Sequence, residues 1–275
     1  MLCNLNELIA MAAQNHHGLA AFNVYDYEDA KAVVNAAEKT GRPVVLMTNK
    51  LAVSHMDMSV LAGIMINVAE STSAPVGVHL DHATDLRVIK QALDLGYSSV
   101  MFDGSQLPFA ENVKLTRAVV EMAHPYGASV EAEIGAVGYS DKTIKFSARL
   151  TDPDEAKQFA YETGTDALAV AVGTVHRMET QGVSLQFDLL SEIHNLIPDV
   201  PLVIHGATGV SDSDLRKLIE AGASKINIGT SLRLKYGEQL RKQFEEDSHV
   251  FDRIVMYEKC APHVEQLVMD KIMSL

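Results

Sequence analysis

The sequence predicts an α/β fold of the (β/α)8, or TIM barrel, class: a closed parallel sheet ringed by helices, in a single domain over residues 1–275. Short runs rich in Val and Ile alternate along the chain with segments of helical spacing, and eight of each fit into about 250 residues. The runs are apolar almost throughout, which is typical of parallel strands buried on both faces. No G-x-G-x-x-G follows the first run, which argues against a doubly wound open sheet.

The elements are expected in strict alternation. The eight strands are expected over residues 19–24, 43–48, 76–81, 98–103, 129–134, 167–172, 201–206 and 225–230. The helices between them are expected over residues 26–41, 57–71, 84–95, 109–123, 154–163, 187–196, 211–221 and 231–246. In the first helix Val33, Ala36 and Ala37 share one face, and Gly41 stops the helix. Residues 135–152, the longest irregular segment, are expected to form a mobile active-site loop.

Composition excludes several classes of protein. The formal net charge of -13 argues against nucleic acid as a partner, and no run approaches the roughly 20 apolar residues of a membrane span. The start of the chain lacks the basic segment of a signal peptide, and Cys3 and Cys260 alone cannot staple a domain of this size. We therefore expect a cytoplasmic protein that binds neither nucleic acid nor a membrane.

Polar side chains gather at the carboxyl ends of the expected strands, where barrel enzymes place their chemistry. These residues are Asn23, Thr48, Asp81, His82, Asp103, Glu133, His176, His205, Asn227 and Thr230. A single histidine at a strand end is usually an ordinary hydrogen-bonding group. Three histidines and two acids on one face, however, would leave several buried polar groups unpaired without a ligand. One layer lower, Glu131 is expected to be structural, and His79 to have a structural or supporting role.

Three of these residues suit a metal ion. His82, His176 and His205 follow the third, sixth and seventh strands and could meet only at the barrel mouth. Three histidine ligands with an open position are typical of catalytic zinc. Asp81 is suited to moving protons on a metal-bound substrate, and the alternative is that it serves as the hydrogen-bond partner of a histidine. Glu133 is either an alternative metal ligand or a group that positions a metal-bound water.

Two loops suit a phosphate group. Residues 205–211, HGATGVS, follow the seventh strand, and residues 229–231, GTS, follow the eighth. Glycines in such loops free backbone N–H groups, and Ser211 with Asp214 resembles a capping box that opens the next helix. Loops after strands seven and eight are the usual phosphate site of these barrels. The two loops together therefore predict phosphate binding.

Several segments, in order, carry a family resemblance: AFNV, HLDHAT, MFDGSQLPFAENVKLT, SVEAEIG, TDP, DALAVAVGTVH, PLVIHGATG and KINIGT. They resemble the class II, metal-dependent fructose- and tagatose-bisphosphate aldolases of carbohydrate metabolism, and most closely the tagatose-type branch of these ketose-bisphosphate aldolases. The resemblance implies a lyase that reversibly cleaves a phosphorylated ketose into dihydroxyacetone phosphate and an aldehyde, through an enediolate stabilised by zinc. It also implies Zn²⁺, often with a monovalent cation (Na⁺ or K⁺), and a homodimer or homotetramer.

The resemblance assigns roles position by position. It places the catalytic zinc on His82, His176 and His205, proton transfer on Asp81, and an acid near the metal on Glu133. The residues expected to bind the substrate and its phosphate are Gly206, Thr208, Asn227, Thr230, Asp103 and Ser105, to which position alone adds Asn23 and Arg177. No lysine Schiff base is expected, because Lys225 begins the last strand at the end of the barrel away from its mouth.

Three departures from the family alter the half of the site that reads the aldehyde. In VHRMET, Arg177 replaces the family's Gly near the phosphate and monovalent-cation sites; it is expected to grip an anionic group or to replace the cation, unless it points outward. The loop GYSDKTIKFSARL lacks the family's Glu-Asp pair and keeps Asp141 as its only acid. The segment MTNKLAVS lacks the usual contact to the distal phosphate.

These departures predict that fructose and tagatose 1,6-bisphosphates are poor substrates. A ketose 1-phosphate with a shorter or unphosphorylated aldehyde half is expected to be better. The opposite preference would point to Lys50, Lys142 or Lys145 as the distal phosphate site. Two other functions stay open at this point: a non-catalytic or regulatory paralog that binds a sugar phosphate, and another metal-dependent reaction on a sugar phosphate, such as isomerisation or hydrolysis.

Overall fold

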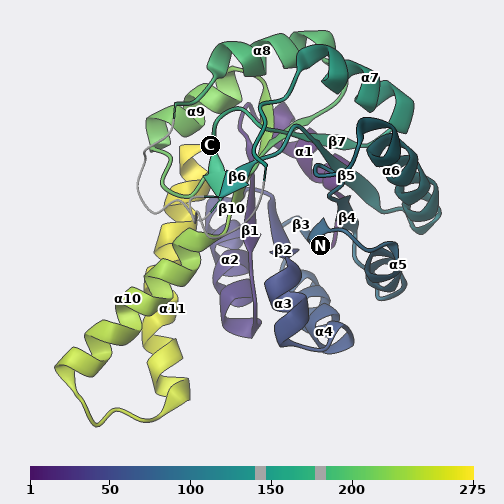
Figure 1. Ribbon diagram of the computed structural model, residues 1–275. Helices are drawn as coiled ribbons and strands as arrows, with labels where there is room; N and C mark the ends of the chain where they lie inside the picture. Colours follow the sequence, from purple (N-terminus) through teal and green to yellow (C-terminus); the bar gives the residue numbers. More distant parts are fainter. Residues whose placement is uncertain (140–146, 177–183) are drawn as a thin grey trace.

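The computed structural model contains a closed barrel of eight parallel strands with helices around it (Figure 1). The structure describes residues 1–139, 147–176 and 184–275. Around the barrel the strands follow the order β1, β10, β9, β7, β5, β4, β3 and β2, so the last barrel strand closes against the first. The expected (β/α)8 fold is confirmed. Within the described residues, no helix is both long and apolar enough to cross a membrane.

The strands and helices are bounded as follows. The barrel strands are β1 (Leu19–Asn23), β2 (Val44–Thr48), β3 (Val76–Ala83), β4 (Ser99–Phe102), β5 (Ser129–Ile134), β7 (Ala167–Val170), β9 (Leu202–Ile204) and β10 (Ala223–Ile228), and a separate small sheet pairs β6 (Gly138–Tyr139) with β8 (Val175–His176). The helices are α1 (Leu5–Gln14), α2 (Tyr27–Thr40), α3 (Lys50–His55), α4 (Met58–Glu70), α5 (Leu86–Asp94), α6 (Phe109–Ala123), η1 (His124–Tyr126), α7 (Pro153–Thr163), α8 (Phe187–Leu196), α9 (Asp212–Glu220), α10 (Thr230–Glu246) and α11 (Arg253–Ser274).

Most boundaries agree with the sequence pattern, and the differences are informative. The strand expected over residues 225–230 is β10, which starts and ends two residues earlier, so that Thr230 begins α10 instead of ending a strand. Helices α1, α3 and α11 and the pair β6–β8 were not expected at all. Residues 140–146 of the long segment after β5 lie outside the described residues, so its expected mobility stays a prediction.

Helix α1 closes the amino-terminal end of the barrel. Its residues Leu5, Leu8 and Ile9 are buried and pack with the inward-facing side chains of the strands, including Met47 of β2 and Met101 of β4. A separate, larger apolar layer lies between the outer faces of the strands and the surrounding helices. With the bottom sealed and both faces buried, the carboxyl ends of the strands are left as the open end.

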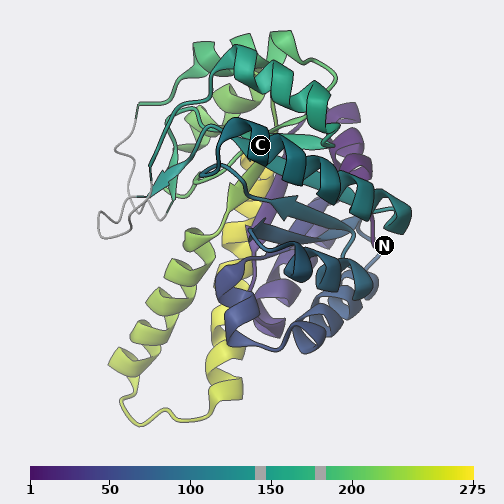
Figure 2. The same ribbon diagram turned by 45° about the vertical axis from the view of Figure 1, so that its right-hand side comes forward.

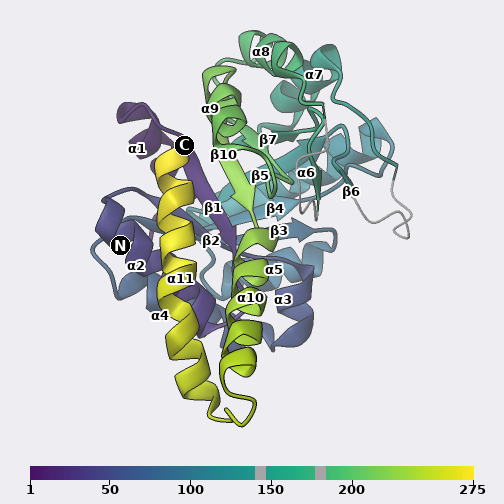
Figure 3. The same ribbon diagram turned by 90° about the vertical axis from the view of Figure 1, so that its left-hand side faces the viewer.

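Helices α10 and α11 lie side by side and project beyond the barrel as an arm (Figures 2 and 3). Helix α11 also packs against α2, which ties the arm to the side of the barrel. The near end of α10 starts directly after β10, at the carboxyl ends of the barrel strands. The arm therefore begins where the polar residues of the strand ends gather.

Candidate active site

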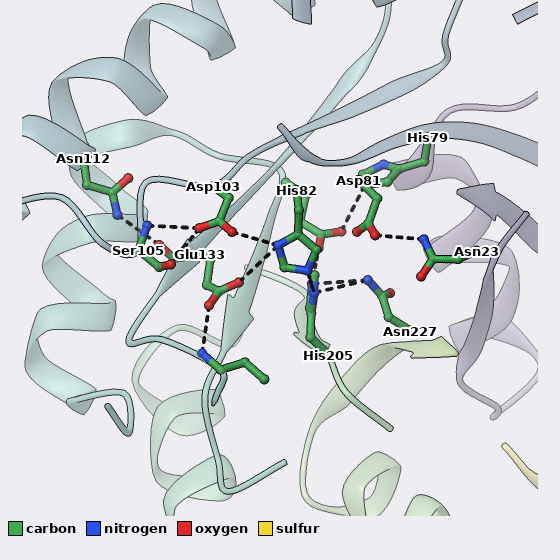
Figure 4. A network of polar contacts seen from close by, with 12 residues as sticks. Asn23, His79, Asp81, His82, Asp103, Ser105, Asn112, Glu133, His205 and Asn227 are labelled. Atoms are coloured by element: carbon green, nitrogen blue, oxygen red, sulfur yellow. Dashed lines mark hydrogen bonds and ion pairs between the residues drawn. The ribbon is translucent and has the colours of Figure 1, made fainter. Parts of the chain in front are cut away.

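A cavity of about 270 Å³ opens at the carboxyl ends of the barrel strands. The expected site residues that line it are Asn23, Asp81, His82, His176, His205, Gly206, Thr208, Asn227 and Thr230. Three others, Asp103, Ser105 and Glu133, are not among its lining residues but connect to His82 from one side (Figure 4). Arg177 falls in residues 177–183, outside the described part of the chain.

Asp81 and His82 both face this cavity although they are neighbours in β3. In a regular strand their side chains would point to opposite faces. His82 has a φ of +51°, in the left-handed region that residues with a side chain rarely adopt, and the pairing of β3 with β4 shifts register between Leu80 and Ala83. This break in the strand turns two consecutive side chains toward one site. A backbone conformation of this kind costs about 1–3 kcal/mol, which the surrounding packing must offset.

Two histidine rings are oriented by carboxylates. His82 Nδ1 lies 2.8 Å from Asp103 Oδ2, and His205 Nε2 lies 2.7 Å from Glu131 Oε1. An ionised carboxylate only accepts hydrogen bonds, so each of these ring nitrogens donates. The remaining nitrogens, His82 Nε2 and His205 Nδ1, face each other 2.8 Å apart (Figure 4). In neutral rings neither would carry a hydrogen, so a shared cation, either a proton or a metal ion, is needed between them.

The electrostatics of the three histidines agree with that requirement. Burial lowers the pKa of His82, but the carboxylates of Asp81 and Asp103 outweigh it and raise the value to about 10. Burial and then the charge of His82 hold the pKa of His176 and of His205 below the usual range. One nitrogen from each ring lies within 4.8 Å of the other two. The donor set, three imidazoles in a pocket rich in carboxylates, fits a divalent metal ion such as zinc.

Unpaired acceptors surround the histidines. Asp81 Oδ2 accepts a hydrogen bond of 2.8 Å from Asn23 Nδ2, whereas Asp81 Oδ1 is buried without a partner among the described residues. Glu133 Oε2 and Asn227 Oδ1 are likewise buried and have no hydrogen-bond partner within that part of the chain. Burial works to raise the pKa of Asp81, but His82 and then His205 overcome it and leave the carboxyl below its ordinary value. Such a site offers acceptors to a cation and to the hydroxyl groups of a sugar.

Glu133 belongs to a second group of potential ligands. Its carboxylate, with His82 and Asp103, offers atoms within 4.8 Å of one another. Glu133 Oε1 accepts from the backbone N–H of Val137 at 3.0 Å, and Oε2 lies 3.9 Å from His82 Nδ1. Burial and then the nearby Asp103 raise the pKa of Glu133 to about 8. A carboxyl group with its pKa in this range can hold or release a proton near neutral pH, next to His82.

The loops after β9 and β10 lie together at one wall of the cavity. Gly206 has a φ of +67°, and a Cβ there would come within 2.6 Å of the backbone of Val175, so glycine is needed for this loop to pack against β8. Ser231 Oγ lies 3.4 Å from Thr208 Oγ1, which joins the two loops. Helix α10 begins at Thr230 without a side-chain cap, so its first N–H groups are available to an anion.

Beneath the histidines lies a buried ion pair that the sequence pattern did not predict. Lys225 Nζ is 2.8 Å from Glu131 Oε2, and both side chains are fully buried. His79 Nε2 lies 3.9 Å from the same oxygen, while His79 Nδ1 is 2.8 Å from Ser99 Oγ. Burial and the charge of Lys225 lower the pKa of His79 to about 4, so this ring is neutral. Lys225 therefore points into the barrel, toward the polar layer below the site.

The cavity also has lining residues that the sequence pattern did not single out, among them Tyr25, Asn49 and Arg233. Lys50, which the sequence offered as an alternative distal phosphate site, lines the same cavity. Arg233 stacks over the ring of Tyr25 at 5.3 Å, and Asn49 Nδ2 donates to the Tyr25 hydroxyl at 3.3 Å. The basic residues at the starts of α3 and α10 were the available sequence signal, because both helices begin directly after barrel strands.

The chain is similar to one family of proteins, both in sequence and in structure. The family model described as fructose-bisphosphate aldolase class-II matches residues 3–275. Among solved structures, the YdjI aldolase from Escherichia coli K12 superposes with a TM-score of 0.87 and 30% sequence identity, covering 100% of this chain and 97% of the other. Fructose-bisphosphate aldolase from Campylobacter jejuni has a TM-score of 0.86 and 20% identity, over 100% of this chain and 95% of that one. The second likeness concerns the fold alone.

Proposed function

The chain belongs to the class II fructose-bisphosphate aldolase family, and on that premise we propose that it is a zinc-dependent aldolase acting on a phosphorylated ketose. The products are dihydroxyacetone phosphate and an aldehyde, in a reversible carbon–carbon cleavage. The observation that carries the proposal is the pair of nitrogens 2.8 Å apart, His82 Nε2 and His205 Nδ1, whose rings each already donate to a carboxylate. His176 supplies the third nitrogen of the proposed zinc site.

The proposed chemistry divides between the metal and the chain. When bound, Zn²⁺ supplies Lewis acidity toward the ketose oxygens. Asp81, whose Oδ1 is free to accept, takes the proton from the hydroxyl group at the bond that breaks. Asn23 holds the other oxygen of Asp81 and so fixes the direction of that acceptor. Glu133 is the acid near the metal and the alternative ligand.

The phosphate of the ketone half is proposed to bind between the two loops at the cavity wall. Gly206, Thr208 and Thr230 present backbone and hydroxyl donors there, and Asn227 lies between the loops and the histidines. Asp103 and Ser105 support the site from behind, since Asp103 accepts from both Ser105 N and His82.

The remaining parts of the proposal are a single domain over residues 1–275, a homodimer or homotetramer, a cytoplasmic location, and a Na⁺ or K⁺ site that Arg177 either adjoins or replaces.

Two candidate substrates, a ketose 1-phosphate and a ketose 1,6-bisphosphate, differ in the aldehyde half. The altered loops after β2 and β5 favour a ketose 1-phosphate with a shorter or unphosphorylated aldehyde half. The sequence motifs support assignment of the chain to the tagatose-type branch. The presence of Lys50 and Arg233 on the cavity wall favours a second anionic group, and with it a 1,6-bisphosphate. These candidates differ in one measurable quantity, the ratio of kcat/KM for a bisphosphate to that for the matching 1-phosphate.

The test is a cleavage screen with the zinc-loaded protein. Fructose and tagatose 1,6-bisphosphates are compared with their 1-phosphates and with ketose 1-phosphates of other lengths. The proposal expects the monophosphates to be cleaved more efficiently. If a bisphosphate is preferred and Lys50→Met removes that preference, the second candidate is correct. Zinc content without cleavage of any phosphorylated ketose would contradict both.

A further inference from the structure

We propose that Lys225 is a positioning residue for the metal ligand His205, and that it acts by fixing which way the hydrogen bonds of Glu131 run. The inference rests on the proposed zinc site, because it concerns the nitrogen that His205 offers to the metal. It assigns a role to the ion pair between Lys225 and Glu131, which is buried in the barrel interior. Neither residue is a proposed metal ligand or a proposed substrate contact.

The three side chains form a chain across the interior of the barrel. Lys225 of β10 contacts Glu131 of β5 at 2.8 Å, and the other carboxylate oxygen contacts His205 Nε2 at 2.7 Å. Strands β5 and β10 are not neighbours, since β7 and β9 lie between them. All three side chains are fully buried, so water does not compete for these contacts.

The direction of each hydrogen bond follows from the chemistry of the groups. A lysine ammonium has only donors, so Glu131 Oε2 must accept. With the carboxylate held as a double acceptor, Oε1 accepts from His205 Nε2, and the lone pair of His205 remains on Nδ1. That nitrogen is the one that faces His82 Nε2. Lys225 therefore selects, through Glu131, the tautomer of His205 that can bind a metal ion.

Glutamine at position 131 exposes this dependence, because an amide has one accepting and one donating end. The Lys225 ammonium can only donate, so the amide oxygen of the glutamine at position 131 must face it. The amide NH₂ is then turned toward His205 Nε2. The hydrogen of the ring then moves to Nδ1, where it blocks the metal. In the opposite orientation the amide NH₂ would face the Lys225 ammonium. Neither orientation satisfies both Lys225 and a His205 ring that keeps its hydrogen on Nε2.

Removing the ammonium as well should free the amide to turn. In Glu131→Gln/Lys225→Met the amide oxygen accepts from His205 Nε2, and the amide NH₂ points to where Lys225 had been. His79 Nε2 lies 3.9 Å from Glu131 Oε2, the atom whose place the amide nitrogen would take, and has no hydrogen-bond partner among the described residues. The Ser99 hydroxyl can donate to or accept from His79 Nδ1, so His79 is able to present an acceptor to the amide. The second substitution should therefore rescue the first.

The experiment measures zinc affinity by competition with a chromophoric chelator, and the His205 tautomer by ¹⁵N NMR of the imidazoles. Glu131→Gln is expected to weaken zinc binding about 10- to 100-fold and to move the ring hydrogen to Nδ1. The double variant is expected to bind zinc about 10-fold more tightly than Glu131→Gln. Glu131→Gln/Lys90→Met is the matched control, since Lys90 pairs with Asp94 on the surface and its loss should restore nothing.

Each outcome decides the matter. The inference is overturned if Glu131→Gln binds zinc like the unmodified protein, or if the double variant binds no more tightly than Glu131→Gln. Should the methionine variant fail to fold, as judged by circular dichroism, Glu131→Gln/Lys225→Gln makes the same comparison with a polar side chain at both positions. If the unmodified protein binds no zinc, the proposed function itself fails; if it binds zinc and the rescue is absent, only the role of Lys225 fails.

Discussion

Asp29 in the first turn of α2 is predicted to make the stability of the protein fall as the pH rises. Its side chain is only 6% exposed, and it accepts a hydrogen bond of 3.0 Å from the backbone N–H of Tyr25. Burial and then the nearby Asp26 carboxylate raise the pKa of Asp29 from 3.8 to about 7. The perturbation is Asp29→Asn, which removes the charge but keeps an oxygen that can accept from Tyr25.

The magnitude follows from the difference between the two pKa values. The folded protein holds the Asp29 proton more tightly than the unfolded chain, so the contribution to stability is fully present below about pH 4 and is lost as the pH rises through about 7. A difference of about 3 pH units, at about 1.4 kcal/mol each, disfavours folding by up to about 4 kcal/mol at pH 8. Asp29→Asn should therefore stabilise the protein at pH 8 by about 3 kcal/mol more than at pH 4.5.

The assay is urea unfolding followed by circular dichroism at pH 4.5 and pH 8, with EDTA present so that metal binding does not contribute. Asp188→Asn is the matched control: Asp188 also lies in the first turn of a helix, α8, but is exposed. The control reports the loss of an acid near a helix N-terminus, which costs about 0.3–1 kcal/mol at either pH. If the gain from Asp29→Asn is the same at both pH values, the carboxyl is not protonated in the folded protein and the reasoning is refuted.

Three predictions concern catalysis. EDTA should abolish ketose cleavage and added Zn²⁺ should restore it; activity that survives EDTA but is lost on borohydride reduction with substrate would indicate a Schiff-base lysine instead. Asp81→Asn should keep its zinc content and slow cleavage about 100- to 10,000-fold, whereas loss of zinc from this variant would mean that Asp81 serves the histidines. Arg177→Gly should raise KM or introduce a requirement for Na⁺ or K⁺, and if steady-state kinetics show neither change, the Arg177 side chain points away from the site.

The barrel could be predicted from the sequence because its strands are continuous apolar runs and its helices carry clear stop signals. Gly41 is one such stop, with a φ of +67° directly after α2. The missed elements lack this alternation. Helix α11 follows α10 without a strand between them, contains Pro262, and has only sparse buried residues toward the far end of the arm. Helix α1 did carry a usable signal, the capping box formed by Asn4 and Glu7.

The part of the candidate site that lies at the carboxyl ends of the strands could be predicted from the sequence. Reading the carboxyl end of each strand brought His82, His176 and His205 together, and the structure places them around one cavity. The tautomers of two of these rings depend on partners from other strands, which no spacing along the chain indicates. Lys225 in particular lies near the start of β10, but its long side chain lets the ammonium reach Glu131 across the barrel.

The left-handed backbone at His82 makes histidine unfavourable for stability at a position where the proposed zinc site requires it. Glycine or asparagine would adopt a φ of +51° more readily than histidine, so either replacement would relieve strain in β3. A library of variants screened only for resistance to heat should therefore enrich glycine or asparagine at this position. Natural proteins that keep histidine at this position would do so because selection for the reaction outweighs the loss of stability. The residue found at position 82 in a related protein would thus indicate whether that protein keeps the proposed metal site.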